Sequence, residues 1–282
     1  MQGRDGPANH GRLCVKGRFG FDYAHHPHRL TQPLVCRADV PKDVNVLHDP
    51  ADWAQVFRPA TWDEALDLAA GQFKTLRDGH GAKALAGFGS AKGSNEEAYL
   101  FQKLVRTGFG SNNVDHCTRL CHASSVAALL MALCLVCGQI GKPGSGRHPL
   151  RGQNNVQGAS DAGLLPMMFP NYQPVDDPAV HAWFEQFWGM SLDAQPGYTV
   201  VEILDKALSP ASGPHKVRGM FIQGENPAMS DPDLNHARAA LASLSHLVVQ
   251  DIFMTETAWQ HDAPLGRVGC AGAGRHRQCQ CA

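Results

Sequence analysis

The sequence has 282 residues, of which 43% are hydrophobic, and a formal net charge of −1. That length is sufficient for one large or two ordinary domains with a buried core. A nearly neutral chain lacks the electrostatic field that gathers nucleic acid or an anionic membrane surface, so neither partner is expected. The longest apolar run, residues 126–137, is far shorter than the ~20 residues of a membrane-spanning helix, and the first residues lack the apolar segment of a secretory signal. We therefore expect a cytoplasmic protein.

Two capping boxes mark the starts of two predicted helices. The first runs from Thr61 to Glu64, and apolar residues then repeat at helical spacing until Gly79 and Gly81. The second comprises residues 94–97 and begins a helix that is expected to end near residue 106. Because each box satisfies the free N–H groups of a first helical turn, both helix starts are well defined.

Short apolar segments alternate with these helices. Strands are predicted over residues 83–88, 217–223 and 246–253, with a loop over 224–230 and a helix from Asp231 that has Pro232 at its first position. Alternating strands and helices indicate an α/β fold with a mainly parallel sheet flanked by helices. Ligands of such folds bind beyond the carboxyl ends of the strands.

The segment from Gly87 to Gly93 is rich in glycine and lies between a predicted strand and a capped helix. Its glycine spacing is one residue longer than that of the dinucleotide fingerprint, so an ordinary tight turn is the plain alternative. Its position before a helix N-terminus nevertheless offers backbone N–H groups to a phosphate.

Nine cysteines in a chain without a secretory signal are more typical of thiols or metal ligands than of disulfides. Cys117 and Cys121 are four residues apart, which on a helix places both on one face. Cys134 and Cys137 have the spacing of a metal site but lie in an apolar run, which favours buried thiols. A zinc ion or a small cluster held by the thiols remains an alternative.

Two longer motifs carry the most specific signal. Residues 113–129 contain Cys121 followed by His122, and residues 149–158 contain Arg151 followed by a dense run of amide side chains. Together with residues 14–20, 87–97, 224–231 and 249–258, these motifs resemble the catalytic alpha subunits of molybdenum-dependent formate dehydrogenases of the soluble, NAD-linked type. The resemblance extends over residues 11–258, and it implies a molybdopterin oxidoreductase-like α/β fold.

The resemblance implies a role for each residue of the reacting centre. Cys121 would ligate molybdenum as a thiolate, His122 would accept a proton or orient formate, and Arg151 would grip the carboxylate with two parallel N–H bonds. Without the motif, His122 would be interpreted as a hydrogen-bonded structural histidine. Lys16 would lie between an iron-sulfur cluster and the pterin, and Cys14 would be the last ligand of that [4Fe-4S] cluster.

The resemblance also implies a set of residues that bind a molybdenum bis(molybdopterin guanine dinucleotide) cofactor. The members that follow the first strand are Ser90, Lys92, Gly93 and Asn95, and those of the amide run are Gln153, Asn154, Asn155, Gln157 and Gly158. The members near the last two strands are Gly224, Glu225, Asn226, Asp231, Asp251, Thr255 and Glu256. A solvated loop is the alternative for the amide run, and a helix cap is the alternative for Asp231.

The implied reaction is the oxidation of formate to carbon dioxide, with electrons passed through iron-sulfur clusters to NAD. Iron-sulfur and flavin- or NAD-binding subunits would be the protein partners. The resemblance places three further cluster cysteines upstream of Cys14, where this sequence has none, so we expect an incomplete cluster and a chain without full activity. A cofactor-binding assembly module without catalysis, or another molybdopterin oxidoreductase such as a nitrate reductase, is the alternative.

The same resemblance divides the chain into five segments. Residues 1–41 would be the remnant of an iron-sulfur domain, and residues 42–116 and 151–258 the two parts of one α/β cofactor-binding domain. Residues 117–150 would be the remnant of a second cofactor-binding domain that carries the metal ligand. Residues 259–282 have no apolar period and are expected to form an irregular tail.

Overall fold

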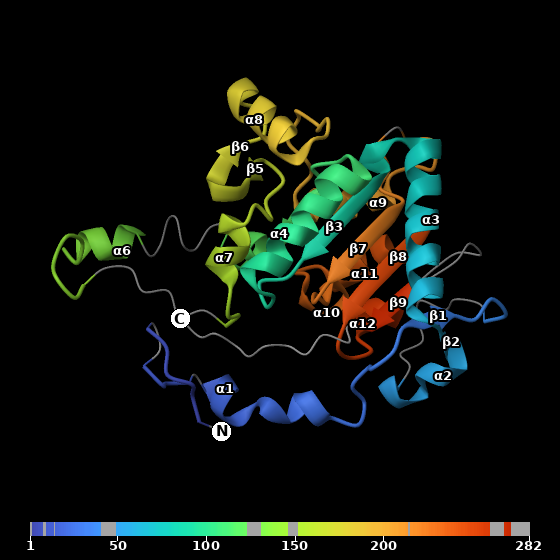
Figure 1. Cartoon of the computed structure of the whole chain (residues 1–282), viewed down its shortest axis with the longest axis horizontal. Helices are drawn as coiled ribbons and strands as arrows, with labels where there is room; N and C mark the ends of the chain where they lie inside the picture. The colour runs from blue at the N-terminus through green and yellow to red at the C-terminus, as the bar shows by residue number, and fades with distance from the viewer. Residues whose placement is uncertain are drawn as a thin grey trace.

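The computed structural model describes residues 2–7, 10–13, 15–40, 49–122, 131–145, 152–213, 215–259 and 268–271. Its main element is a sheet formed by β1 (Leu34–Cys36), β2 (Phe57–Pro59), β3 (Leu85–Gly89), β4 (Val114–His116), β7 (Gly219–Gln223), β8 (His246–Asp251) and β9 (Val268–Ala271). The strand order is β2-β1-β9-β8-β7-β3-β4 (Figure 1). No helix in the described part of the chain is long and apolar enough to span a bilayer.

The five strands from β9 to β4 are parallel, whereas β1 runs antiparallel to both β2 and β9. The prediction of a mainly parallel sheet is therefore confirmed. Taken in chain order, the parallel strands follow the 2-1-3-4-5 arrangement of doubly wound sheets, in which successive crossovers change direction after the first pair. The topological switch point of this sheet consequently lies between β3 and β7.

Helices cover both faces of the sheet because its strands are apolar on both sides. On one face Leu85 and Val248 pack against α3 (Trp62–His80) and α4 (Asn95–Lys103). On the other face Phe88 and its neighbours pack against α9 (Val200–Leu208) and α11 (Leu234–Ala242). Figure 1 shows these two helical layers around the strands.

Helix α3 begins where the sequence predicts. Oγ1 of Thr61 accepts a hydrogen bond from the backbone N–H of Glu64 at 3.2 Å, and the helix ends at Gly81, whose φ is 84°. The residues that face the sheet are Ala65, Ala69 and Phe73, spaced by four. Trp62 and Leu66 belong to the same apolar repeat but are exposed, because the sheet covers only a narrow stripe of the helix.

The second capping box is present in full. The side chain of Ser94 accepts from the N–H of Glu97 at 3.2 Å, and the carboxylate of Glu97 accepts from the N–H of Ser94 at 2.6 Å. The helix continues past the predicted end as the π-helix η4 (Leu104–Phe109), which stops at Gly110 in a left-handed conformation. This wider turn accommodates Arg106, whose side chain is completely buried.

Several predicted boundaries differ from the structure. Strand β7 begins at Gly219 rather than at residue 217, and β8 ends at Asp251 rather than at residue 253. The predicted loop 224–230 contains the short helix α10 (Pro227–Ser230). The helix expected from Asp231 begins at Leu234, because Asp233 and not Asp231 caps it by accepting from the N–H of His236 at 3.1 Å.

Two further expectations need correction. Strand β9 lies within the segment 259–282, which was expected to be irregular, and it pairs with β8 in parallel. Cys134 and Cys137 were expected to be buried thiols, but Cys137 is exposed and Cys134 only partly buried. Both lie on or just after helix α6 (Met131–Val136), on which Leu133, Leu135 and Val136 are also exposed.

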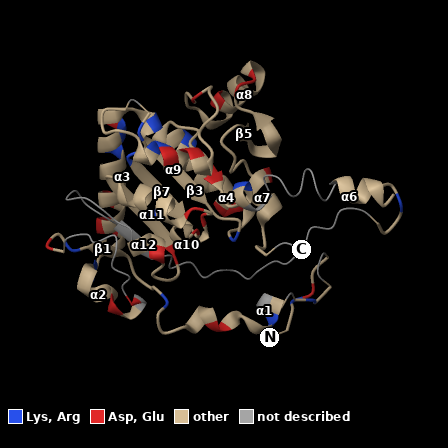
Figure 2. Ribbon diagram, turned by 180° about the vertical axis from the view of Figure 1, so that it is seen from behind, with Lys and Arg blue, Asp and Glu red and all other residues tan. Residues whose placement is uncertain are grey.

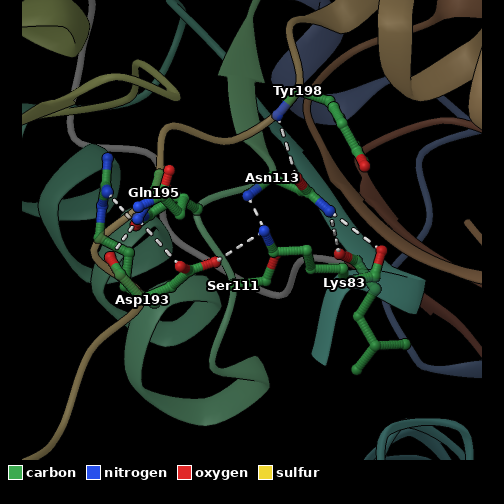
Figure 3. Close-up of polar contacts among 9 residues, drawn as sticks. Lys83, Ser111, Asn113, Asp193, Gln195 and Tyr198 are labelled. Atoms are coloured by element: carbon green, nitrogen blue, oxygen red, sulfur yellow. Dashed lines mark hydrogen bonds and ion pairs between the residues drawn. The ribbon is translucent and has the colours of Figure 1, made fainter. Parts of the chain in front are cut away.

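The amino-terminal ends of β3 and β4 are fixed by two adjacent asparagines. Nδ2 of Asn113 donates to the carbonyl oxygens of Lys83 and Leu85, at 3.1 and 3.2 Å, and its Oδ1 accepts from the N–H of Tyr198 at 3.0 Å (Figure 3). Nδ2 of Asn112 donates to the carbonyl oxygens of residues 193 and 195. These bonds hold the loop before α9 against the edge of the sheet that is opposite to the expected ligand site.

The remaining elements are short and peripheral. They are α1 (Val15–Phe19), η1 (Phe21–His25), η2 (Pro50–Asp52), α2 (Trp53–Val56), η3 (Ala82–Ala84), α5 (Thr118–His122), α7 (Val156–Asp161), β5 (Met168–Phe169), η6 (Pro170–Tyr172), β6 (Gln173–Pro174), α8 (Pro178–Trp188) and α12 (Glu256–Trp259). Strands β5 and β6 form a hairpin that shares a small aromatic cluster with α8. Nε1 of Trp188 donates to the hydroxyl of Tyr99 at 2.9 Å and joins this cluster to α4.

Candidate functional site

Two loops meet at the switch point of the sheet. One follows β3 and begins with Ser90, and the other follows β7 and begins with Gly224. A Cβ atom at Gly224 would lie 3.0 Å from the Cβ of Ser90, and the φ of Gly224 is 63°, so a side chain there would be both crowded and strained. The close approach of these loops leaves polar groups of both at the carboxyl edge of the parallel strands.

The amide run docks on the loop that follows β3. The backbone N–H of Asn155 donates to the carbonyl oxygen of Ala91 at 2.8 Å, and its Nδ2 donates to that of Gly93 at 3.0 Å. Nδ2 of Asn154 donates to the carbonyl oxygen of Lys92 at 3.2 Å. Segments about sixty residues apart in the sequence are therefore tied together at this edge, where Asn155 is partly buried and Asn154 is exposed.

Gly158 lies at the contact between the amide run and α4. A Cβ atom there would lie 2.1 Å from Oδ1 of Asn155 and 2.1 Å from Oδ1 of Asn95, which no packing adjustment of a few tenths of an ångström could relieve. Nδ2 of Asn155 also donates to Oδ1 of Asn95 at 2.9 Å. Gln157, one residue earlier, is exposed on α7.

Cys117 lies directly after β4 and faces the amide run. Its Sγ donates to Oε1 of Gln153 at 2.7 Å. Burial, reinforced by the nearby carboxyl of Glu225, raises the pKa of this thiol to about 12. Cys117 lies directly before α5, the helix that contains Cys121. The prediction that both cysteines lie on one face stays a prediction, because the side chain of Cys121 lies outside the described residues.

Glu225 follows β7 and brings a carboxyl group into the same region. Burial raises its pKa to about 7, although Cys117, Lys92 and Ser90 all favour its ionised form. Its Oε1 is buried and has no hydrogen-bond partner in the described part of the protein. A carboxyl that titrates near neutral pH at a strand end is a typical feature of functional sites.

Asn226 joins the loop after β7 to the one after β8. Its Nδ2 donates to Oε2 of Glu256 at 2.7 Å, and its Oδ1 accepts from the hydroxyl of Thr257 at 2.8 Å. Oδ1 of Asp251 accepts from its neighbouring backbone N–H at 2.6 Å, and Thr255 precedes α12. These loops form the second wall of the carboxyl edge.

Asp231 is buried, with 9% of its surface exposed. Its Oδ1 accepts from the N–H of Asp233 at 3.3 Å, while its Oδ2 has no partner among the described residues. Burial raises the pKa of this carboxyl. Because an unpaired buried oxygen is costly, this atom is suited to accept a hydrogen bond from a bound group.

The expected metal-binding residues cannot be placed in this geometry. Cys14 and Arg151 lie outside the described residues. The backbones of Lys16, Cys121 and His122 belong to α1 and α5, but their side chains also lie outside the described part. Within the described part, no group of three or more His, Cys, Asp or Glu side chains is arranged to hold a metal ion.

Two buried groups beside the site were not predicted from the sequence. Oδ2 of Asp115 accepts from Nε of Arg119 at 3.0 Å and from the N–H of Val200 at 3.0 Å, which fixes the start of α5 and α9. Nε2 of His116 lies 3.1 Å from the hydroxyl of Ser160 on α7, and burial lowers the pKa of His116 to about 4. The spacing of four between Asp115 and Arg119 is a signal that could have revealed the first pair.

A doubly wound sheet with polar loops at its switch point defines a class of α/β domains that bind ligands beyond the carboxyl ends of their strands. Residues 29–131 and 122–265 each match the molybdopterin oxidoreductase family, and the chain belongs to this family. The structure is similar to that of acetylene hydratase from Pelobacter acetylenicus, with a TM-score of 0.55 and 12% identity over 94% of this chain and 58% of the other. This likeness supports the fold.

Among curated relatives, the chain is similar to the F420-dependent formate dehydrogenase subunit alpha of Methanocaldococcus jannaschii, with 26% identity over 92% of this chain and 58% of the relative. It is also similar to formate dehydrogenase H of Escherichia coli, with 25% identity over 92% and 57%. The chain thus spans little more than half of these relatives. The first alignment extends over 422 positions, more than the length of this chain, so the relative contains internal residues that have no counterpart here.

Proposed function

We propose that this chain belongs to a formate-oxidising enzyme and binds one guanine dinucleotide arm of a molybdenum bis(molybdopterin guanine dinucleotide) cofactor at the carboxyl edge of its sheet. The single observation that carries the binding proposal is the meeting of three polar segments at the switch point, namely the loops after β3 and β7 and the amide run. The formate dehydrogenase relatives and the motif around Cys121 support the choice of formate.

The described residues fit such a group. Among the described residues, Oδ2 of Asp231 and Oε1 of Glu225 are buried and have no hydrogen-bond partner, and a guanine base carries N–H donors that could satisfy acceptors of this kind. The backbone N–H of Gly93 and the side chain of Lys92 would contact a phosphate, whereas the N–H of Ser94 is already held by Glu97. Ser90, Lys92, Asn95 and the amides of residues 153–157 would hold the rest of the arm, with Gly224, Asn226, Asp251, Thr255 and Glu256 on the other wall.

When bound, the cofactor would supply a metal that accepts two electrons, so formate would yield carbon dioxide, two electrons and one proton. Cys121 would ligate the metal as a thiolate, and Arg151 would hold the carboxylate with its planar fork of donors. His122 would orient formate or take the proton. Lys16 would lie on the electron path towards a [4Fe-4S] cluster that Cys14 helps to bind, and iron-sulfur and flavin- or NAD-binding subunits would carry electrons on to NAD.

Two measurements test this proposal separately. Chain produced in a host that makes the cofactor is expected to contain molybdenum by elemental analysis, and Cys121→Ser is expected to lose it. Formate-dependent dye reduction is expected to fall with Arg151→Gln, and Arg151→Lys is expected to restore little of it because lysine cannot donate two parallel bonds. Molybdenum-free protein with no dye reduction would contradict catalysis by this chain.

A cofactor-binding assembly module without catalysis is the second candidate. The observation that favours it is that the chain forms the parallel sheet although it lacks internal residues that the relatives contain. This function predicts that GDP, as a probe of the dinucleotide arm, raises the melting temperature of the chain. The increase should be smaller in Asp231→Asn, and an unchanged melting temperature at millimolar GDP would argue against both functions.

A further inference from the structure

Residues 131–145 form an apolar arm, which consists of α6 and the turns that follow it. Leu133, Leu135 and Val136 are 59%, 61% and 85% exposed, and Ile140 is also exposed. Lys142 is the one charged residue of the arm. Figure 1 shows α6 standing apart from the sheet and its helices, and in Figure 2 the helix carries neither charge colour.

The arm begins at a junction in the comparison with the family. The two family matches, to residues 29–131 and 122–265, meet where the arm begins. Relatives have internal residues that this chain lacks. Burying the exposed apolar side chains of α6 against another surface would be favourable.

A groove of matching character lies between α4 and α7. Tyr99, Leu100 and Ala162 provide its apolar surface, and Glu96 and Asp161 add carboxylates to its lining. Asn95 and Gly158 of the proposed cofactor site complete the lining, so the groove borders that site. Leu100 is 63% exposed, and Leu104, one turn further on, extends the same apolar stripe. The arm of the same chain does not cover this groove, since both surfaces are exposed in a single copy.

We propose that the apolar arm of one copy packs into the α4–α7 groove of a second copy, and that the exchange is reciprocal. Each copy carries both surfaces, so a two-fold pair satisfies both at once. The arm has a positive charge at Lys142 and no acidic residue, whereas the groove has Glu96 and Asp161 in its lining. Opposite charges would therefore set the orientation of the arm while the leucines provide the apolar contact.

Sedimentation velocity of the whole chain over a hundredfold range of concentration tests the pairing. We expect a monomer–dimer equilibrium whose dissociation constant rises at least tenfold in Leu133→Ser/Leu135→Ser and in Leu100→Ser/Leu104→Ser. Val201→Ser, at an equally exposed apolar position on α9, serves as the matched control and should leave the equilibrium unchanged. A chain that stays monomeric throughout would overturn the proposal. A dimer whose dissociation constant is unchanged by the groove substitutions would overturn it as well.

Two further variants separate specific pairing from indiscriminate aggregation. Lys142→Glu should weaken the dimer, and adding Glu96→Lys should restore it. Under mild oxidation, Leu100→Cys should give a disulfide-linked dimer through the exposed Cys137 of the other copy, and this band should vanish when Cys137→Ser is added. A linked dimer that persists without Cys137, or no linked dimer at all, would contradict the proposed contact.

Discussion

The thiol of Cys117 lies 2.7 Å from Oε1 of Gln153 and donates to it, which joins the end of β4 to the amide run 36 residues later. Further contacts surround this pair at the carboxyl edge of the sheet. The backbone of Asn155 is bonded to Ala91, and Glu225 approaches the same thiol from β7. Together these contacts connect the loops after β3, β4 and β7 with the amide run, and the chemistry of Cys117 can be tested directly.

Alkylation should distinguish Cys117 from the exposed Cys137. Because burial raises the pKa of Cys117 to about 12, only roughly one molecule in ten thousand carries the reactive thiolate at pH 8. We expect iodoacetamide to label Cys137 in minutes and to leave Cys117 unmodified until the protein is unfolded in urea. Peptide mass spectrometry gives the order of labelling, and equal rates in native buffer would show that Cys117 is not buried as described.

Glu225 should make the folded chain less stable as the pH rises. Its pKa is about 7 in the folded protein and near 4.5 when unfolded, so the folded state binds more protons in this interval. The free energy of unfolding should therefore decrease between about pH 4.5 and 7, by at most about 3 kcal/mol from this group. Urea denaturation at pH 5 and pH 8 should show a smaller difference in Glu225→Gln, and an unchanged pH dependence would be evidence against a buried carboxyl.

Arg106 should be among the least replaceable side chains. It is completely buried, and it donates to Gln102 at 2.8 Å, to Asn112, and to the carbonyl oxygens of Gly163, Leu165 and Met168. Arg106→Met would leave those buried acceptors without a donor and is expected to lower the free energy of unfolding by about 3 kcal/mol or more.

The exposed Lys74→Met provides a matched control for this change, since it also replaces a cation by methionine on a neighbouring helix. It should change the free energy of unfolding by less than about 0.5 kcal/mol. Comparable losses in the two variants, measured by urea denaturation, would contradict the structural role of Arg106.

Gly158 and Gly71 should respond in opposite ways to alanine. A methyl group at Gly158 would collide with Oδ1 of both Asn95 and Asn155, whereas at Gly71, within α3, no atom lies within 4 Å. Gly71→Ala is expected to raise the free energy of unfolding by up to about 1 kcal/mol, because alanine favours a helix. Gly158→Ala should lower the free energy of unfolding and reduce the increase in melting temperature that GDP gives. A neutral Gly158→Ala would show that the amide run is not held against α4.

The sequence allowed the local parts of this fold to be predicted well. The N-caps Thr61 and Ser94 each accept from a residue three positions later, so their helices could be placed to within a residue at the start. Only the box at Ser94 is complete, since the carboxylate of Glu64 pairs with Arg58 instead. Boundaries that depend on tertiary contacts were less accurate. Helix η4 continues past residue 106 because Arg106 finds its partners in residues 163–168, which no local pattern indicates.

The candidate site was predictable as a set of loops but not as a set of contacts. The glycines and amides near Gly93 and Asn155 carry a recognisable motif, and the structure brings them together. The roles of Cys117 and Glu225 could not be predicted, because their raised pKa values come from burial between three separate strands. The partners of Cys121 and Arg151 stay predictions, since their side chains lie outside the described residues.

The path between β4 and α7 has a consequence for evolution and engineering. The chain leaves the sheet after β4 and returns through the amide run at the same carboxyl edge, and none of the described residues of this excursion pairs with a strand of the sheet. Its length can therefore change greatly while every hydrogen bond between β3, β4 and β7 is retained. A foreign domain could be inserted at this position, or a domain removed from it, without changing the residues of the sheet.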